Sequence, residues 1–238
     1  MIESYTLNKP LNNKTNSDTI LAQITASAKD EVLNFIYLGK QEYNKMWKIQ
    51  KQIHELVKND NMPSIVLFLE HDHVYTFGKN SNKDFLLNSY PDNTQIVESD
   101  RGGQITYHGP GQLIGYPIIN LNHFTKSVSW FMRSLEQIII MTLHEYNISA
   151  DRKEGMTGVW VDNEKICAMG VRLSRWTSMH GFALNIKPDM KYFDCMIPCG
   201  IFDYGVTSMY DVLSEEIEVK EIIEKISNNF TRVFKRSN

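Results

Sequence analysis

The chain has no long apolar run among its 238 residues. The longest, IVLFL at 65–69 and III at 138–140, are far shorter than the about 20 residues of a membrane-spanning helix. The first thirty residues contain neither a hydrophobic signal core nor an arginine, so no secretory or transit peptide is expected. We expect a protein with no membrane association, located in the cytoplasm. An organelle is the alternative if a targeting segment has been trimmed from this sequence.

Cysteine is scarce, with only Cys167, Cys195 and Cys199, and no CxxC pair occurs. Reduced thiols and no structural zinc are expected. His71 and His73 would share one face of a strand, but no third ligand lies near them in the sequence, so we predict no metal site. The formal net charge of -3 gives no electrostatic reason to expect nucleic acid as a partner.

Nucleotide-binding signatures are also missing: there is no GxxxxGK[ST] loop and no GxGxxG after a strand. The GPGQ string at 109–112 has glycines but no lysine placed to meet phosphates. We therefore predict no cofactor, and the energy for any group transfer should arrive in the substrate. A thiol that accepts an acyl group from a thioester and passes it to an amine needs no nucleotide.

Hydrophobic periodicity predicts a single α/β (α+β) domain with a mixed, largely antiparallel sheet flanked by helices, without alternating βαβ units. A polar, loosely held extension is expected over 1–30 and the folded domain over 31–238. The predicted elements are helices at 39–58, 129–146 and 219–234, a buried strand at 64–71, and a three-stranded meander at 157–186 with turns at 162–163 and 175–176.

The segment RGGQITYHGPGQLIGYP (101–117) contains five glycines with polar side chains between them. Glycine lets a backbone approach a neighbour closely, which suits a wall built to hold a ligand. The alternative is a β-hairpin whose glycines serve only turns and bulges. The segment alone does not decide between these interpretations.

Cys199 lies between a proline and a glycine in IPCGIFD, a setting that presents a side chain on a defined loop. A reactive thiol needs a group that stabilises the thiolate, and His180, His108 and Lys165 are the candidates. Most free cysteines are buried and inert, and we interpret Cys167 and Cys195 in that way. A papain-like Cys–His pair is the weakest alternative, since it also needs an orienting Asn or Asp.

Taken together, several segments resemble the octanoyltransferase family, also called lipoyl(octanoyl) transferase or lipoate protein ligase B. The resemblance covers about residues 36–213. The matching segments are YLGKQEYNKMWKIQ (37–50), EHDHVYTFGK (70–79), RGGQITYHGPGQLIGYPIINL (101–121), GVWVDNEKICAMGVRLSRW (158–176), HGFALNI (180–186), IPCGI (197–201) and VTSM (206–209).

The resemblance implies the fold of the biotin and lipoate protein ligase catalytic domain over 31–238, with Cys199 as the acyl-accepting nucleophile and Lys165 as its partner. The implied donor is octanoyl-acyl carrier protein. The implied acceptors are lysines on lipoyl domains of 2-oxoacid dehydrogenases and on the glycine cleavage H protein. The implied substrate-binding residues are Arg101, Gly102, Gly103, Gln104, Ile105, Thr106, Tyr107, His108, Ala168, Met169, Gly170, Gly181, Phe182 and Ala183.

Each implied role has a physical reading. Lys165 would favour the thiolate and later accept a proton from the attacking amine. Backbone N–H groups around a turn at 168–170 would hold the developing oxyanion. Glycines at 102, 103, 109 and 111 would leave a channel for the eight-carbon tail, and Lys79 and Arg101 would attract acidic protein partners.

The sequence departs from the family pattern at His73, Lys79 and Cys167, where proline, arginine and a small residue are usual. Oxidation could link Cys167 to Cys199 if their Cα atoms approach within about 7 Å. Two other classes of protein stay open: an ATP-dependent lipoate or biotin ligase on the same fold, and a catalytically silent binding domain. A nucleotide requirement would indicate the first, and a failure to acquire an acyl group would indicate the second.

Overall fold

The computed structural model describes residues 15–196 and 204–235. Its helices are α1 (Ser17–Ser27), α2 (Tyr43–Lys58), α3 (Val128–His144), α4 (Met209–Leu213) and α5 (Val219–Val233). Its strands are β1 (Asn34–Gln41), β2 (Ile65–His71), β3 (Val74–Phe77), β4 (Gln95–Glu98), β5 (Thr106–His108), β6 (Gln112–Ile118), β7 (Asp151–Lys153), β8 (Met156–Val161), β9 (Glu164–Ser174), β10 (Thr177–Asn185) and β11 (Gly205–Val206). None of the helices in these two ranges combines the length and apolarity needed to cross a membrane.

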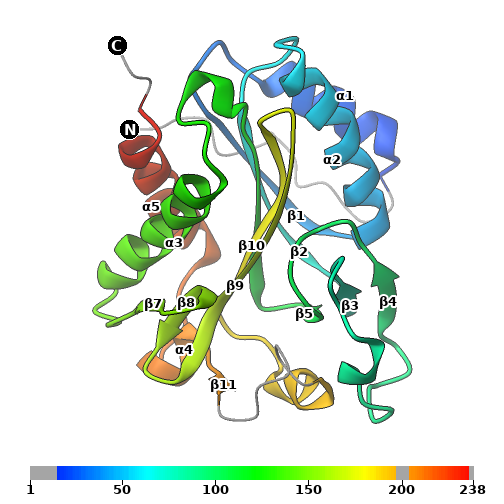
Figure 1. Cartoon of the computed structure of the whole chain (residues 1–238), viewed down its shortest axis with the longest axis vertical. Coiled ribbons are helices and arrows are strands. Elements are labelled where there is room, and N and C mark those ends of the chain that lie inside the picture. The colour runs from blue at the N-terminus through cyan, green and yellow to red at the C-terminus, as the bar shows by residue number, and fades with distance from the viewer. Residues whose placement is uncertain (1–14, 197–203, 236–238) are drawn as a thin grey trace.

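An eight-stranded mixed sheet forms the centre of the molecule (Figure 1). Its order is β1-β2-β6-β10-β9-β8-β7, and β11 pairs with β9. Most neighbours are antiparallel, while β1 runs parallel to β2 and β11 parallel to β9. The predicted fold class, a mixed and largely antiparallel sheet flanked by helices, is confirmed. A separate three-stranded sheet, β4-β3-β5, was not predicted.

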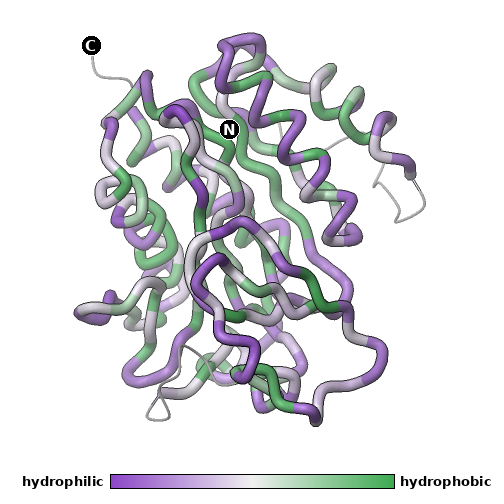
Figure 2. The backbone as a smooth tube through the Cα atoms, turned by 45° about the vertical axis from the view of Figure 1, so that its right-hand side comes forward, coloured by the Kyte–Doolittle hydropathy of each residue, from purple (hydrophilic) through white to green (hydrophobic). Residues whose placement is uncertain are grey.

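Helices cover both faces of the large sheet (Figures 1 and 2). Alternate strand residues pack in the two layers between the sheet and these helices. In β2, Val66 and Phe68 pack in the core beneath α3 and α5, whereas Ile65 and Leu67 pack in the core beneath α1 and α2. Because successive strand side chains point to opposite faces, a strand buried on both sides is apolar throughout. This explains the uninterrupted IVLFL sequence.

Helix α2 begins later than predicted. The Glu42 side chain accepts hydrogen bonds from the amides of Asn44 and Lys45 at 2.8 and 2.7 Å, which fixes the N-terminus at Tyr43. Gly39 belongs instead to β1, which is parallel to β2. The chain therefore contains one β1-α2-β2 unit, which the sequence reading had excluded. A parallel pair requires such a crossover. Strand β1 was not predicted, because the strong helical pattern that follows it was extended back to Gly39.

Residues 17–27 were expected to be loosely held, and for this part of the extension the expectation is wrong. They form α1, capped by Asn16, whose side chain accepts from the Thr19 amide at 2.8 Å. Ile20 and Ile24 are fully buried against α2 and the sheet. Two isoleucines four positions apart give too little periodicity to predict a helix from sequence, yet they suffice to dock one on an existing apolar face.

The meander at 157–186 is confirmed as β8-β9-β10. Arg175 and Trp176 both have positive φ, 48° and 65°, and form the two-residue connection between β9 and β10. Asp162, with φ 49°, begins the turn between β8 and β9. These turns bring β9 to the middle of the sheet, where it reaches the site described next.

Candidate active site

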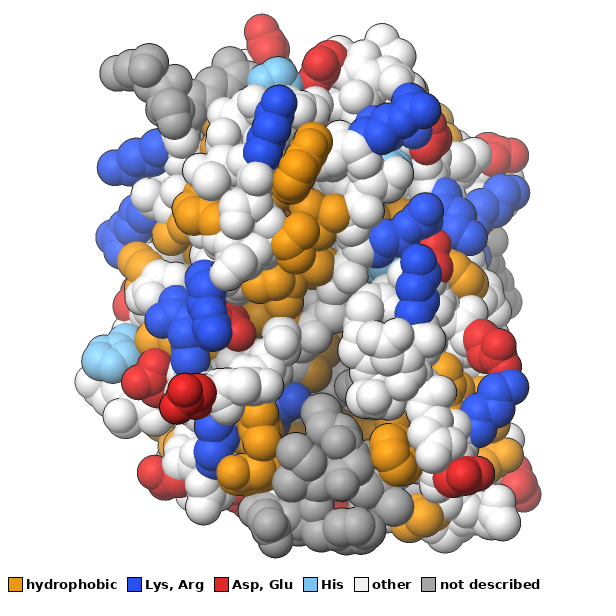
Figure 3. Space-filling model, in the orientation of Figure 1, with side chains coloured by type: hydrophobic (Ala, Val, Ile, Leu, Met, Phe, Trp, Pro, Cys, Tyr) orange, Lys and Arg blue, Asp and Glu red, His pale blue; other side chains and the backbone are white. Residues whose placement is uncertain are grey.

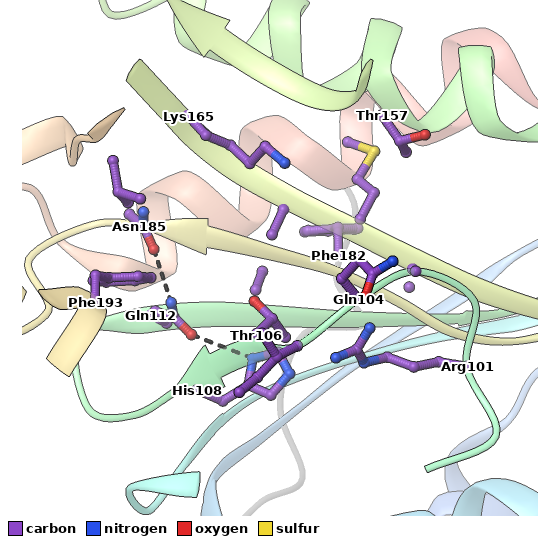
Figure 4. Close-up of a pocket in the computed structure, with 18 of the residues that line it drawn as sticks. Arg101, Gln104, Thr106, His108, Gln112, Thr157, Lys165, Phe182, Asn185 and Phe193 are labelled. Atoms are coloured by element: carbon purple, nitrogen blue, oxygen red, sulfur yellow. Dashed lines mark hydrogen bonds between the residues drawn. The ribbon is translucent and has the colours of Figure 1, made fainter. Parts of the chain in front are cut away.

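A cavity of about 380 Å³ opens between the loop before β5 and the β8-β9-β10 meander. The space-filling view shows the hollow near the centre of one face, with hydrophobic side chains beside it (Figure 3). Lys165 points into this space from β9, opposite Thr106 and Arg101 (Figure 4). The cavity is lined by every predicted substrate-binding residue except Gly102 and Tyr107.

Gly102 and Tyr107 support the cavity wall from behind. The Gly102 amide donates to the Val171 carbonyl at 3.0 Å and joins the loop to β9. Tyr107 is fully buried, with its hydroxyl 2.7 Å from His73 Nδ1 and its ring stacked on Tyr192 at 4.9 Å. Neither residue lines the cavity, and their assignment as substrate contacts stays a prediction.

The predicted glycine channel is wrong for two positions. A Cβ on Gly109 would lie 1.9 Å from the Tyr107 hydroxyl, and one on Gly111 would lie 2.1 Å from the Lys187 carbonyl oxygen. These glycines allow the protein to pack closely against itself. Gly103 does line the cavity, as predicted.

Arg101 is a buried wall residue, with 6% of its surface exposed. Its Nε donates to Thr76 Oγ1 at 3.1 Å, and its Nη1 donates to the Gly102 carbonyl at 3.0 Å. The expectation that Arg101 attracts acidic partners from the surface is therefore wrong. Lys79 is exposed, so its charge is available to solvent.

Lys165 is placed by the register of β9. It lies opposite Trp160 of β8 and pairs with Val206 of β11 on the other side. Its Nζ is 4.7 Å from the centre of the Trp160 ring, and its stem passes Gly158, where a Cβ would lie 3.4 Å from Lys165 Cε. The register of β8 and β9 shifts by one residue at Ile166, which places Lys165 toward the cavity while Ile166 and Cys167 both enter the core.

Residues 168–170 are not a turn, as was predicted, but the interior of β9. Ala168, Met169 and Gly170 pair with Ala183, Phe182 and Gly181 of β10. Pairing of β9 with β8 ends at Cys167, and Val171 already directs its carbonyl away from β10 to Gly102. In a strand, the backbone N–H and C=O groups of residues two apart point to the same side. The Met169 amide therefore points, like the Val171 carbonyl, to the side of β9 that β8 no longer pairs with. An oxyanion donor at this position is thus compatible with a strand.

One wall of the cavity is polar, and of its members only His108 was predicted from the sequence. Gln112 Nε2 donates to Asn185 Oδ1 at 2.8 Å, its Oε1 lies 3.3 Å from His108 Nδ1, and Asn185 Nδ2 donates to the Thr207 carbonyl at 2.8 Å (Figure 4). Burial lowers the pKa of His108 well below its ordinary value. This histidine is therefore a neutral hydrogen-bonding group near pH 7.

His180 also lines the cavity and is engaged by a carboxylate. Its Nε2 lies 2.7 Å from Asp100 Oδ1, which also accepts from Trp47 Nε1 at 3.2 Å. Burial lowers the pKa of His180, while the hydrogen bond and charge of Asp100 oppose that shift. His180 has φ 61°, and its backbone amide donates to Gln50 Oε1 at 3.0 Å. Nothing in the sequence near His180 indicated these partners.

Cys199 lies outside the described residues, but the chain on both sides of it borders the cavity. Met196, before the undescribed stretch, and Tyr204, after it, both line the cavity. Val206, two residues on, pairs with Lys165. The described residues on either side of the gap therefore border the cavity into which Lys165 points.

The other two cysteines are buried. Cys167 is fully enclosed in the main core, and burial raises the pKa of its thiol. The suggested link between Cys167 and Cys199 involves a residue outside the described ranges.

The two histidines considered for a metal are occupied in other ways. His71 is buried between the Gln41 carbonyl and the Tyr116 hydroxyl, each 2.7 Å away, and burial lowers its pKa to about 4. His73 stacks on Tyr192 with ring centres 4.2 Å apart. No group of three or more potential metal ligands occurs in the part of the chain that the structure describes.

Comparison with known proteins gives a family match and several relatives. Residues 42–231 match the lipoyl protein ligase A/B catalytic domain family. An octanoyltransferase of Flavobacterium psychrophilum is 44% identical over 218 residues, covering 83% of this chain and 94% of that relative. An octanoyltransferase of Christiangramia forsetii is 42% identical over 218 residues, covering 83% and 93%.

Among solved structures, a lipoate-protein ligase A bound with ATP superposes with a TM-score of 0.68 at 10% identity, covering 88% of this chain and 89% of that one. At this identity the likeness concerns the fold. The family follows from the sequence relatives and the domain match together. The chain belongs to the octanoyltransferase family, acyltransferases that transfer octanoyl groups in protein lipoylation.

Proposed function

We propose that Cys199 accepts the octanoyl group as a thioester. Lys165 would donate a proton in the first half-reaction and accept one in the second. The observation that carries this proposal is the arrangement around the cavity. Lys165 points into it, and the chain enters and leaves the Cys199 segment at its edge, through Met196 and Tyr204. A thiolate beside an ammonium group is a competent nucleophile at neutral pH.

The two steps balance in atoms and protons. In the first, the Cys199 thiolate attacks the donor thioester, the bond from the acyl carbon to the donor sulfur breaks, and the Lys165 ammonium protonates the departing thiolate. In the second, a neutral acceptor amine attacks the Cys199 thioester and its proton passes to the Lys165 amine. The Cys199 thiolate leaves, and the starting ion pair is restored.

The cavity walls suit an acyl chain with a polar head. Ala168, Met169, Phe182 and Ala183 offer apolar surface to the tail, whose burial contributes about 0.8 kcal/mol per CH₂. The Met169 amide is the candidate donor to the tetrahedral oxyanion, since it faces the open edge of β9. Charge develops on that oxygen only during the reaction, so this donor favours the transition state over the bound thioester.

We propose octanoyl-acyl carrier protein as the donor. The proposed acceptors are lysines of lipoyl domains in 2-oxoacid dehydrogenases and in the glycine cleavage H protein. The catalytic domain would span 31–238, with α1 adding to its packing, and the reaction would take place in the cytoplasm, where thiols stay reduced. Exposed Lys79 remains available to attract acidic carriers.

Intact-mass measurement after incubation with octanoyl-acyl carrier protein tests this scheme. The wild type should gain one octanoyl group that hydroxylamine removes, and addition of an apo lipoyl domain should discharge it without ATP. Cys199→Ser should form no hydroxylamine-labile adduct. Lys165→Ala should be acylated at least about 100-fold more slowly, because a positioned acid–base group contributes about 100-fold or more to the rate. Cys195→Ser is the matched control and should behave as the wild type.

Two outcomes would reject the scheme. An adduct that persists in Cys199→Ser would place the acyl group elsewhere. A wild-type protein that modifies the lipoyl domain only with free octanoate and ATP would instead be a ligase.

A further inference from the structure

Trp160 lies directly against the proposed general base. Its side chain lines the cavity with 6% of the residue exposed. Because Trp160 and Lys165 are opposite partners in the β8–β9 register, both side chains project from the same face of the sheet. The resulting distance of 4.7 Å from Lys165 Nζ to the ring centre is within the range of a cation–π interaction.

The same ring contacts the chain that returns from the Cys199 segment. Tyr204 meets Trp160 edge to face, with ring centres 5.5 Å apart. Lys153 Nζ lies 4.0 Å from the Tyr204 ring and 5.4 Å from the Trp160 ring. Trp160 therefore touches both the lysine and the first described residue after the segment that carries the nucleophile.

The indole nitrogen of Trp160 does not explain why a tryptophan occupies this position. Its Nε1 is buried and has no hydrogen-bond partner within residues 15–196 and 204–235. A buried donor without an acceptor lowers stability, so a phenylalanine or leucine would fill the space at less cost. What the indole offers beyond those residues is the most favourable aromatic face for a cation.

We propose that Trp160 is a positioning residue for Lys165. Its ring holds the Lys165 ammonium at the cavity, where the positive charge favours the Cys199 thiolate. This inference deepens the proposed function and rests on it for the roles of Lys165 and Cys199. Gly158, two residues before Trp160 on β8, also lies beside the lysine stem, where a Cβ would make an ordinary van der Waals contact with Lys165 Cε at 3.4 Å.

The test compares Trp160→Leu, which removes the aromatic face, with Trp160→Phe, which keeps a weaker one. The control is Tyr146→Leu, which removes a ring 4.9 Å from Lys225 Nζ, a pair that takes no part in lining the cavity. The first readout is the pH dependence of iodoacetamide alkylation of Cys199, followed on its own peptide by mass spectrometry. This chemical readout does not depend on any acyl donor.

We expect the alkylation midpoint of Trp160→Leu to move to higher pH by about 0.4 to 1.5 units, with a smaller shift in the same direction for Trp160→Phe. Acyl transfer should slow by about 2- to 10-fold in kcat in Trp160→Leu, with KM for the donor unchanged. The control should match the wild type in both measurements, because its aromatic ring contacts another lysine.

An unchanged midpoint in a folded Trp160→Leu protein would overturn the inference, as would a change confined to KM. If Trp160→Leu does not fold, Trp160→Phe decides by the same measurement. The two proposals fail separately. A wild type that forms no acyl adduct refutes the proposed function, even if the alkylation shift occurs. An adduct in the wild type with no shift in the Trp160 variants refutes only this inference.

Discussion

Two walls of the cavity are each anchored by a carboxylate, and the two anchors differ in kind. Glu136 of α3, with its side chain 2% exposed, accepts hydrogen bonds from Arg133, Arg152 and the Gly158 amide behind β8. Asp100, 25% exposed, contacts His180, receives a hydrogen bond from Trp47 and forms an ion pair with Arg172, beside the loop at 101–105. The first anchor holds the wall that carries Lys165 and Trp160, and the second holds the opposite one.

The difference concerns which partners can change charge. Arginine stays charged at all ordinary pH values, so the Glu136 anchor keeps its ion pairs. The Asp100 anchor also pairs with an arginine, Arg172, but it contains in addition a histidine, His180, whose pKa burial has lowered. The two anchors therefore differ in one partner: His180 beside Asp100 can gain a proton as the pH falls, whereas both side-chain partners of Glu136 are arginines.

The largest effect is expected from Gly158→Ala in the lysine wall. Gly158 has φ +122°, and a Cβ there would lie 2.7 Å from the Cys167 carbonyl oxygen. We expect a loss of about 2–4 kcal/mol in the free energy of unfolding from clash and backbone strain, together with slower acyl transfer. Gly155→Ala is the matched control, since Gly155 also has positive φ (+72°) but no atom within 4 Å of a Cβ. Equal losses in urea denaturation would show that packing at 158 is unimportant.

Glu136→Ala should come next, with a loss of about 2–3 kcal/mol, because it leaves the buried Gly158 amide without its acceptor and removes two ion pairs. Arg133 and Arg152 are 53% and 30% exposed and can regain water, which keeps the loss below that of a fully buried pair. Glu136→Gln should lose less, since it retains an acceptor. Glu216→Ala, in a solvent-exposed pair with Lys187, provides the baseline. A loss no greater than this baseline would contradict the anchoring role.

The smallest effect, and the one that depends on pH, is expected from Asp100→Asn. Below about pH 6.5, His180 takes up a proton in the unfolded chain. In the folded protein burial lowers the pKa of His180, so it takes up that proton only at lower pH. The free energy of unfolding therefore falls as the pH falls. The negative charge of Asp100 raises the pKa of His180 against the effect of burial, and so limits this loss of stability. The variant should therefore lose about 1 kcal/mol near pH 7.5 and more near pH 5, measured by urea denaturation.

Asp60→Asn is the control for that experiment. Asp60 also contacts a histidine, His123, at 2.9 Å, but the two side chains are 64% and 43% exposed. Solvent screening should leave this variant with little change in stability at either pH. A parallel pH response in the two variants would mean that burial of His180 is not the cause.

Much of the fold could be predicted because its signals are local. Helices α2, α3 and α5 follow from apolar spacing, and the β9–β10 turn follows from its place between alternating segments. The failures have local causes as well. The end of β1, residues 39–41, was included in the predicted helix and the rest of the strand was not predicted, while α1 has only Ile20 and Ile24 to mark it. In both cases docking on a neighbouring surface decides the structure.

The site could be predicted in part. Lys165 and most of the substrate-binding set were named because the segments resemble a known family, and they do line one cavity. The partners Asp100 and Glu136 were missed because they meet His180 and Gly158 across 80 and 22 positions of sequence. No motif links residues so far apart, and only the sheet order brings them into contact.

By itself, the sequence determined the family, the chemistry of the candidate groups and the periodic elements, because these depend on side-chain type and on spacing over a few residues. Tertiary structure decided which glycines pack inward, which arginine is buried, and which ring faces the lysine. Those outcomes depend on strand register: the one-residue shift at Ile166 sets Lys165 and Trp160 side by side at the cavity.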